Sequence, residues 1–241
     1  MADPILSGRR LTKAYGALRV LREVDFDVFP GEVLGVLGPN GAGKTTLFNM
    51  VSGDAILDAG SLRFAGEDLR SEAPHQRCRR GIGRTYQIPK PYGAMSAFEN
   101  LLVAAMFGAR RSTREAYAYC SAILEDCGLG DKANKSAGKL TLLDRKRLEL
   151  ARALASNPKV LLLDEIAGGL TEEESHLLVR LVGHIRERGV TIIWIEHVLN
   201  AILAVADRIL VLNFGEKIAE GLPDAVLGDP EVRRVYMGVA A

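Results

Sequence analysis

The stretch GPNGAGKTT, at residues 38–46, limits the possible folds more than any other feature of the chain. It fits the pattern G-x-x-x-x-G-K-[ST], with the apolar run VLGVL before it and a helical pattern after it. A glycine-rich turn between a buried strand and a helix lets backbone N–H groups surround a phosphate, and the helix N-terminus adds partial positive charge. The stretch predicts a phosphate loop that binds nucleotide through Gly38, Pro39, Asn40, Gly41, Ala42, Gly43, Lys44, Thr45 and Thr46.

Binding a nucleotide with its metal and hydrolysing it requires side chains outside this loop. Lys44 is predicted to reach the β and γ oxygens of a nucleotide such as ATP, and the Thr45 hydroxyl to ligate Mg²⁺. Such a metal also needs a carboxylate, and the run VLLLDE places Asp164 where α/β sheets bind ligands. We expect Asp164 to hold the metal through water and Glu165 to polarise the attacking water as general base. His197 ends the next apolar run, VTIIWIEH, and is predicted to hydrogen-bond a γ-phosphate or that water.

The rest of the chain predicts an α/β fold with three parts. Apolar runs alternate with helical patterns, which indicates a parallel sheet covered on both faces. The N-terminal runs LRVLREVDFDVFPGE and GSLRFAGEDL alternate apolar and polar residues, as antiparallel strands do. We predict one domain over residues 1–241: a nucleotide-binding core and an antiparallel β subdomain at 1–87 and 158–241, and an inserted α-helical subdomain at 88–157.

Composition excludes several classes of protein. Lys and Arg total 31 against 30 Asp and Glu, so no overall field attracts nucleic acid, and none is expected as a partner. The three cysteines form no CxxC pair, which is typical of reduced thiols in a cytosol. No apolar run reaches the roughly 18 residues that a membrane span needs, so we expect a soluble or peripheral chain.

The stretch KLTLLDRKR predicts the start of a helix. Thr141 and Asp144 have the spacing of a capping box, so the helix is expected to begin at Leu142. Two leucines at such a polar start are unusual for a surface helix.

The set of motifs resembles the ATPase subunit of an ABC transporter over nearly the whole chain, with the motifs in the same order and spacing. GIGRTYQ, DEIAGGLT, IEHVLNAI and VLNFGEKIAEGLPDAVLGDPEV are most similar to the ATPase subunits of branched-chain amino acid importers. The resemblance implies that Tyr15 stacks on adenine and that Gln87 links Mg²⁺ to the helical subdomain during catalysis. It also implies that His197 is a switch histidine and that residues 168–171 cross a dimer.

In this family a helix start reading L-S-G-G-Q, or a close variant, touches the ATP held by the partner in a head-to-tail dimer. The matching signature segment here is residues 140–144, which are Leu140, Thr141, Leu142, Leu143 and Asp144. Thr141 keeps a hydroxyl, whereas the two leucines fill space that glycine leaves open. We expect Asp144 to place a negative charge near the γ-phosphate, unless Arg145 or Arg147 compensates, and so to weaken the site without abolishing it.

The functional expectation is an ABC-type ATPase that uses ATP and Mg²⁺ to power an importer of branched-chain or related amino acids. The implied partners are a second ATPase subunit, integral membrane permease subunits and, indirectly, a periplasmic binding protein. A heterodimer is expected because the phosphate loop, Glu165 and His197 fit the pattern while the signature segment departs from it; a homodimer is the alternative. The permease contact is expected after Gln87, and the location at the cytoplasmic face of the bacterial inner membrane.

Other interpretations stay open from the sequence. One is a nucleotide-dependent regulatory partner with a weakened signature and little turnover. Another is an ABC protein of translation or DNA repair, which would normally need tandem ATPase domains or a long coiled-coil insertion. Amides, urea and aromatic acids remain alternative transport substrates.

Overall fold

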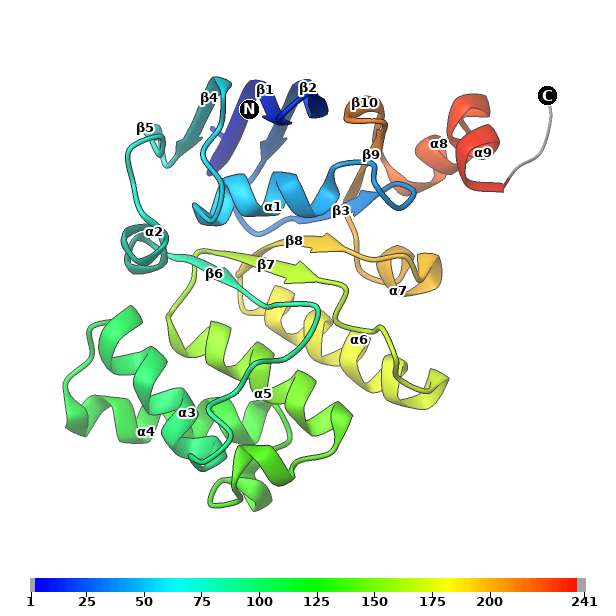
Figure 1. The fold of residues 1–241 in the computed structure, drawn as a ribbon. Helices are drawn as coiled ribbons and strands as arrows, with labels where there is room; N and C mark the ends of the chain where they lie inside the picture. Colours follow the sequence, from blue (N-terminus) through cyan, green and yellow to red (C-terminus); the bar gives the residue numbers. More distant parts are fainter. Residues whose placement is uncertain (1–2, 238–241) are drawn as a thin grey trace.

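The structure is a computed structural model that describes residues 3–237 and places two β-sheets above a group of helices (Figure 1). The first sheet has four strands in the order β2-β1-β4-β5, and every neighbouring pair is antiparallel. Its strands are β1 Leu6–Tyr15, β2 Leu18–Val28, β4 Ala59–Phe64 and β5 Glu67–Asp68.

The second sheet forms the nucleotide-binding core, with six strands in the order β10-β9-β3-β8-β7-β6. All neighbouring pairs are parallel except β10 with β9, which is a hairpin. Strands β3, β7 and β8 are buried at every residue because both faces of this sheet are covered. The strands are β3 Val33–Leu37, β6 Ile82–Arg84, β7 Val160–Asp164, β8 Thr191–Ile195, β9 Arg208–Asn213 and β10 Glu216–Gly221.

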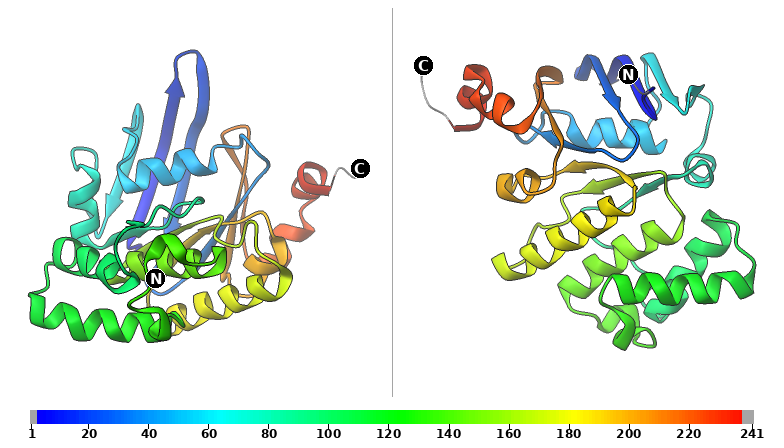
Figure 2. Two further views of the ribbon diagram at one scale, coloured as in Figure 1. Left: turned by 60° about the horizontal axis from the view of Figure 1, so that its bottom comes forward. Right: turned by 180° about the vertical axis from the view of Figure 1, so that it is seen from behind.

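Helix α1 (Lys44–Ser52) lies between the two sheets, and its Phe48 and Met50 are fully buried in the core there (Figure 1). The opposite face of the second sheet packs on apolar side chains of the C-terminal half of the chain. In the view from behind, the yellow helix over residues 172–187 runs along this face (Figure 2). The helices outside the helical group are α2 Pro74–Arg80, α6 Glu172–Glu187, α7 Leu199–Leu203, α8 Pro223–Gly228 and α9 Pro230–Met237.

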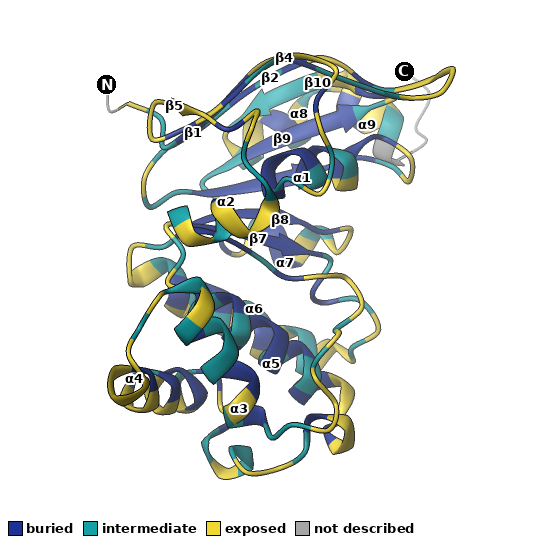
Figure 3. Ribbon diagram, turned by 60° about the vertical axis from the view of Figure 1, so that its left-hand side comes forward, coloured by how far each residue is buried: buried dark blue, intermediate teal, exposed yellow. Residues whose placement is uncertain are grey.

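The helical group has its own apolar core, visible as the buried inner faces of its helices in Figure 3. Helix α5 belongs to two cores at once: Leu148 and Ala151 pack within the helical group, whereas Leu150 and Ala153 pack under the second sheet. This helix therefore joins the helical group to the core mechanically. The members are α3 Ala97–Val103, a π-helical turn Ala104–Gly108, α4 Thr113–Asp126, the 3-10 turns Gly130–Lys132 and Ala137–Lys139, and α5 Leu142–Ala155.

The predicted fold class is confirmed by these sheets and helices, with two refinements. Strand β6 was not expected; it is a three-residue edge strand that pairs in parallel with β7. Helix α5 begins at Leu142 as predicted, but only half of the capping box forms. The Thr141 hydroxyl accepts a 3.2 Å hydrogen bond from the Asp144 N–H, while the Asp144 carboxylate turns elsewhere. The residue boundaries of the helical subdomain stay a prediction.

Candidate nucleotide-binding and hydrolysis site

The order of the core sheet brings three functional segments to one edge. Strand β8 lies between β3 and β7, and Ile195 is in register with both Val36 and Asp164. The loop after β3, Glu165 after β7 and His197 after β8 therefore leave the sheet side by side. Ligands bind at such carboxyl ends of parallel strands, so the predicted site residues meet where the chemistry needs them.

The phosphate loop is shaped by glycines that no other residue could replace. A Cβ at Gly38 would lie 2.2 Å from the Leu212 carbonyl oxygen. At Gly43 the φ angle is +102°, and a Cβ would lie 2.7 Å from Leu21 Cδ2 and 2.8 Å from the Val20 oxygen. Gly43 also begins α1 without any side-chain cap, which leaves the helix N-terminus suited to an anion.

Lys44 is buried at the first turn of α1, inside this loop. Its Nζ donates to the carbonyl oxygens of Gly38 at 2.7 Å and Pro39 at 3.0 Å. Burial lowers the pKa of Lys44, and the charges of Glu165 and Asp164 oppose that change. The loop thus holds a partly desolvated cation that a phosphate could draw away from the two carbonyls.

Asp164 is buried at the end of β7 and is held by a residue that the sequence did not indicate. Arg84 Nη2 donates to Asp164 Oδ2 at 3.0 Å, while Arg84 Nη1 contacts Asn49, Ser52 and Asp54 within 3.0 Å. Burial raises the pKa of Asp164, and Arg84 opposes the rise. A carboxylate and the exposed Thr45 hydroxyl are oxygen donors of the kind that Mg²⁺ prefers, so the donor set fits this metal.

Glu165 is the centre of a cluster that unites all three predicted catalytic residues. Gln87 Nε2 donates to Glu165 Oε2 at 2.5 Å, and His197 Nδ1 lies 3.9 Å from the same oxygen. Glu165 has a φ of +46°, in the left-handed region that residues with a Cβ rarely adopt. Its N–H donates to the Ile195 oxygen at 2.9 Å, which fixes the strained residue beside β8. Strain of this kind is concentrated at functional sites.

Two buried charged residues near this cluster were also missed from the sequence. Glu196 is fully buried and accepts hydrogen bonds from the N–H groups of Ala167 at 2.7 Å, His197 at 3.1 Å and Val198 at 3.5 Å. Lys146, on α5, is 4% exposed. An acid directly after an all-apolar strand and a lysine on the apolar face of a helix were the signals that could have indicated them.

The comparisons with known proteins agree with this geometry. The family profile described as ABC transporter matches residues 21–168. The chain belongs to the ABC transporter ATP-binding family. A second profile, described as branched-chain amino acid ATP-binding cassette transporter, matches residues 216–241 of this ABC ATPase.

Individual relatives cover the whole ABC ATPase. The high-affinity branched-chain amino acid transport ATP-binding protein BraF of Pseudomonas aeruginosa is 37% identical over an alignment of 255 positions that covers 100% of each chain. The lipopolysaccharide export system ATP-binding protein LptB of Escherichia coli K12 is 35% identical over 233 residues, 97% of each chain. The crystal structure of the ADP conformation of MJ1267, an ATP-binding cassette of an ABC transporter, has a TM-score of 0.87 at 31% identity and covers 99% of this chain and 100% of its own. The protein is therefore a nucleotide-binding, ATP-hydrolysing subunit of an ABC transporter.

The signature segment of the ABC ATPase differs from the sequence expectation. Asp144 does not present its charge outward: it is buried, with Oδ1 2.9 Å from Lys132 Nζ and 3.8 Å from Arg147 Nη1. The compensation that would remove its repulsion of a partner's γ-phosphate is present, from Arg147 as expected and also from Lys132, and the weakening of the site stays a prediction. Arg145 takes no part, since it donates to the Leu140 and Gly138 oxygens at 3.0 Å.

The leucines of the segment also differ from one another. Leu140 and Leu143 are buried in the ABC ATPase, whereas Leu142 is 46% exposed. A Cβ built on Gly169 would lie 3.6 Å from Leu142 Cδ2, so the segment packs beside the predicted dimer-crossing loop of its own chain. Of the two extra leucines, only Leu142 is exposed, and the contact of this segment with a partner stays a prediction.

Tyr15 ends strand β1 in the ABC ATPase, and its ring is 51% exposed with Lys13 Nζ 5.2 Å from its centre. The following strand, β2, contacts the phosphate loop through Val20 and Leu21. The predicted adenine role of Tyr15 stays a prediction.

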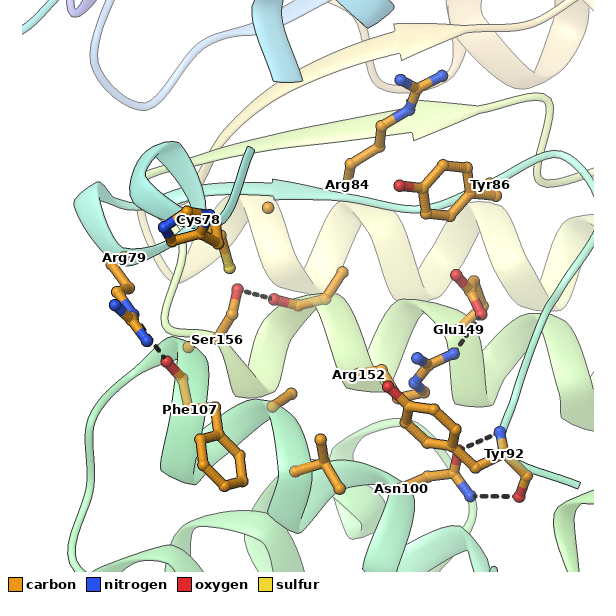
Figure 4. A pocket seen from close by; sticks show the side chains of 16 residues that line it. Cys78, Arg79, Arg84, Tyr86, Tyr92, Asn100, Phe107, Glu149, Arg152 and Ser156 are labelled. Carbon is orange, nitrogen blue, oxygen red and sulfur yellow. Dashed lines mark hydrogen bonds and ion pairs between the residues drawn. The ribbon is translucent and has the colours of Figure 1, made fainter. Parts of the chain in front are cut away.

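A groove of about 310 Å³ lies between β6, α2 and the helical group (Figure 4). Tyr86, Tyr92 and Phe107 line it, and all three are large exposed hydrophobic residues. Arg152 fixes one wall, because Nη1 donates to the Lys90 oxygen and to Glu149 Oε2, each at 3.0 Å. The lining residues therefore flank Gln87 in sequence, with Tyr86 before it and Tyr92 after it, and α5 forms one wall through Glu149 and Arg152.

Proposed function

We propose that this ABC ATPase binds ATP with Mg²⁺ and powers the import of branched-chain or related amino acids. The observation that carries the hydrolytic part is the cluster of Gln87, Glu165 and His197 around one carboxylate oxygen, beside a complete phosphate loop. Bound Mg²⁺ would supply charge neutralisation at the β and γ phosphates.

The chain's own residues have separate roles in this proposal. The loop N–H groups and Lys44 bind the phosphates, and Thr45, Gln87 and Asp164 hold the metal, Asp164 through water. Glu165 accepts a proton from the attacking water, and Gln87 orients this carboxylate by donating to it. His197 hydrogen-bonds the γ-phosphate from the end of β8.

The proposed substrate class rests on similarity. BraF is a branched-chain amino acid transport protein, and the C-terminal profile carries the same description. The 35% identity to LptB, which serves lipopolysaccharide export, makes export the competing assignment. The C-terminal match over residues 216–241 favours amino acids, because it lies outside the general ABC profile.

The proposed partners are permease subunits, a second ATPase subunit and, indirectly, a periplasmic binding protein. No helix among residues 3–237 is both long and apolar enough to cross a membrane, so membrane attachment would depend on a permease. The groove beside Tyr86, Tyr92 and Phe107 suits such a contact, because these aromatic side chains are exposed and Tyr86 directly precedes Gln87 in sequence. The protein would then lie at the cytoplasmic face of the bacterial inner membrane.

We propose that the second ATPase subunit is a different chain. A partner with an ordinary signature has glycine at the position that corresponds to Leu142. Such a partner would complete the nucleotide site at this chain's phosphate loop without placing a leucine side chain there. The buried pairing of Asp144 removes one reason for this proposal, and the exposed side chain of Leu142 is the reason that remains.

The test is reconstitution in vesicles with the permease subunits, comparing the wild type with Lys44→Ala. We expect ATP-driven uptake of leucine, isoleucine or valine that Lys44→Ala abolishes. Release of lipopolysaccharide in place of uptake would contradict the substrate class. Brisk turnover by the chain alone would contradict the heterodimer, and nucleotide-driven dimerisation with no turnover beside any partner would favour the regulatory alternative.

A further inference from the structure

Lys146 joins α5 to the backbone of two hydrolytic residues. Its Nζ donates to the Gln87 oxygen at 3.5 Å and to the Glu165 oxygen at 3.4 Å. These contacts span 59 and 19 residues of sequence, so they connect the helical group to two loops of the core. The side chain is almost fully buried, and a buried charge persists only where polar groups compensate it.

Glu196 and Glu165 supply that compensation from the core side. Burial lowers the pKa of Lys146, and the charges of Glu196 and Glu165 oppose the change. Glu196 is itself fixed by the N–H groups of Ala167 and His197, which belong to the segments after β7 and β8. Lys146 therefore faces a negatively charged surface formed by the hydrolytic edge of the sheet.

The same lysine lies one helical turn from the signature segment. Residues four apart on a helix share a face, so Lys146 and Leu142 lie on the same side of α5. Leu142 is beside Gly169, and Thr141 caps the helix start. A shift of α5 driven through Lys146 would move the segment that, under the proposed function, faces the partner's nucleotide.

We propose that Lys146 is a positioning residue that transmits the state of the chain's own Gln87 and Glu165 to its signature segment. The inference rests on the proposed function, because it assumes that nucleotide engages the Gln87 and Glu165 side chains. When nucleotide binding shifts the backbone at Gln87 or Glu165, the carbonyl oxygen of that residue moves, and the ammonium group that contacts both oxygens moves with it. Each chain would thereby couple its own site to the site that it completes for its partner.

The test is hydrogen exchange of the full chain over residues 139–147, with and without a non-hydrolysable ATP analogue and Mg²⁺. Wild type, Lys146→Arg and Lys146→Met are compared, and affinity is measured separately with a fluorescent ATP analogue. We expect the analogue to change exchange at the signature segment in wild type and in Lys146→Arg. In Lys146→Met we expect that response to be lost. The affinity of this variant for the ATP analogue should stay within about threefold of wild type, because the substitution removes no phosphate contact.

Turnover provides a second measurement on the same variants. Lys146→Met should lower kcat by roughly tenfold with little change in KM, within the usual range of coupling between sites. Lys146→Arg should restore most of it because the cation and its donors remain. The matched control is Lys159→Met, which removes the same charge at an exposed position beyond α5 and should behave as wild type.

An unchanged exchange response in Lys146→Met would overturn the proposal, as would a wild type that binds the analogue without any response at the segment. If wild type binds no analogue at all, the proposed function itself fails. Should Lys146→Met not fold, Lys146→Gln keeps a neutral donor at the position, and the same outcomes decide the question.

Discussion

Asp144 and Lys132 form an ion pair of 2.9 Å inside the helical group, twelve residues apart in sequence. Asp144 stands where related signature segments have glutamine. Through this pair it links the start of α5 to the 3-10 turn Gly130–Lys132. The acid therefore contributes to the stability of the helical group, and Lys132 offsets its charge.

We predict that Asp144→Gln destabilises the protein and does not raise its ATPase activity. The variant leaves Lys132 and Arg147 without their carboxylate. The loss should be roughly 1–3 kcal/mol, below the roughly 3–5 kcal/mol of fully buried pairs because Lys132 is partly exposed. Urea unfolding measures it, with Asp131→Asn as the control because that carboxylate is exposed. Higher ATPase activity in Asp144→Gln would show that the charge does act on the partner's nucleotide.

We predict that Glu165→Gln removes hydrolysis but keeps nucleotide binding. Glutamine preserves the size of the side chain and cannot accept the proton, so turnover should fall by about 10²- to 10⁴-fold. Phosphate release and binding of a fluorescent ATP analogue measure the two properties. Glu173→Gln, an exposed acid on α6, should leave both unchanged. Equal losses of binding and turnover in Glu165→Gln would instead indicate a structural role.

Arg77 is buried beneath the phosphate-loop helix and supports its end. Its guanidinium donates to the oxygens of Leu69 at 2.6 Å, Glu72 at 2.9 Å and Val51 at 3.1 Å, and also to that of Met50. We predict that Arg77→Lys lowers the free energy of unfolding by about 2–4 kcal/mol, since one ammonium group cannot reach four carbonyls. Thermal unfolding compares this variant with Arg79→Lys, because Arg79 is an exposed arginine on α2, the helix that also contains Arg77. Equal melting temperatures for the two variants would refute the prediction.

Cys127 should make the protein less stable at alkaline pH. Burial raises the pKa of this thiol from its ordinary value of 9.0 to about 12. Above pH 9 the unfolded chain loses the thiol proton while the folded chain keeps it, so rising pH favours unfolding. For this group the loss is about 1.4 kcal/mol per pH unit up to the folded pKa.

We therefore predict that raising the pH from 8 to 10 lowers the free energy of unfolding less in Cys127→Ala than in wild type. The two decreases should differ by about 1 kcal/mol. Urea unfolding at the two pH values gives the loss of stability for wild type and for the variant. Subtracting one loss from the other cancels the titration of groups that both proteins share. Cys78→Ala is the comparison and should show a smaller difference, because burial also raises the pKa of Cys78 but that thiol is only partly buried. Parallel losses in wild type and Cys127→Ala would show that the thiol does not titrate differently in the folded state.

The sequence by itself determined the parts of this protein that depend on local order. The phosphate loop, the acids ending β7 and the start of α5 at Leu142 follow from residue types at fixed spacings along one strand, turn or helix. The meeting of Glu165 and His197 could also be anticipated, because parallel strands end at one edge of a sheet. Gln87 was expected near them only from the family resemblance, because the strand before it, β6, was not predicted.

Only the tertiary structure decided which groups neutralise the buried charges. Asp164 is paired with Arg84 across 80 residues, and Lys146 reaches the Gln87 oxygen across 59. The direction of Asp144 was misjudged because a cap pattern describes one helix turn and contains no information about Lys132 on another segment. Burial makes an unpaired charge costly, so its partner is whichever opposite charge packing brings near. That choice depends on the fold as a whole and not on sequence spacing.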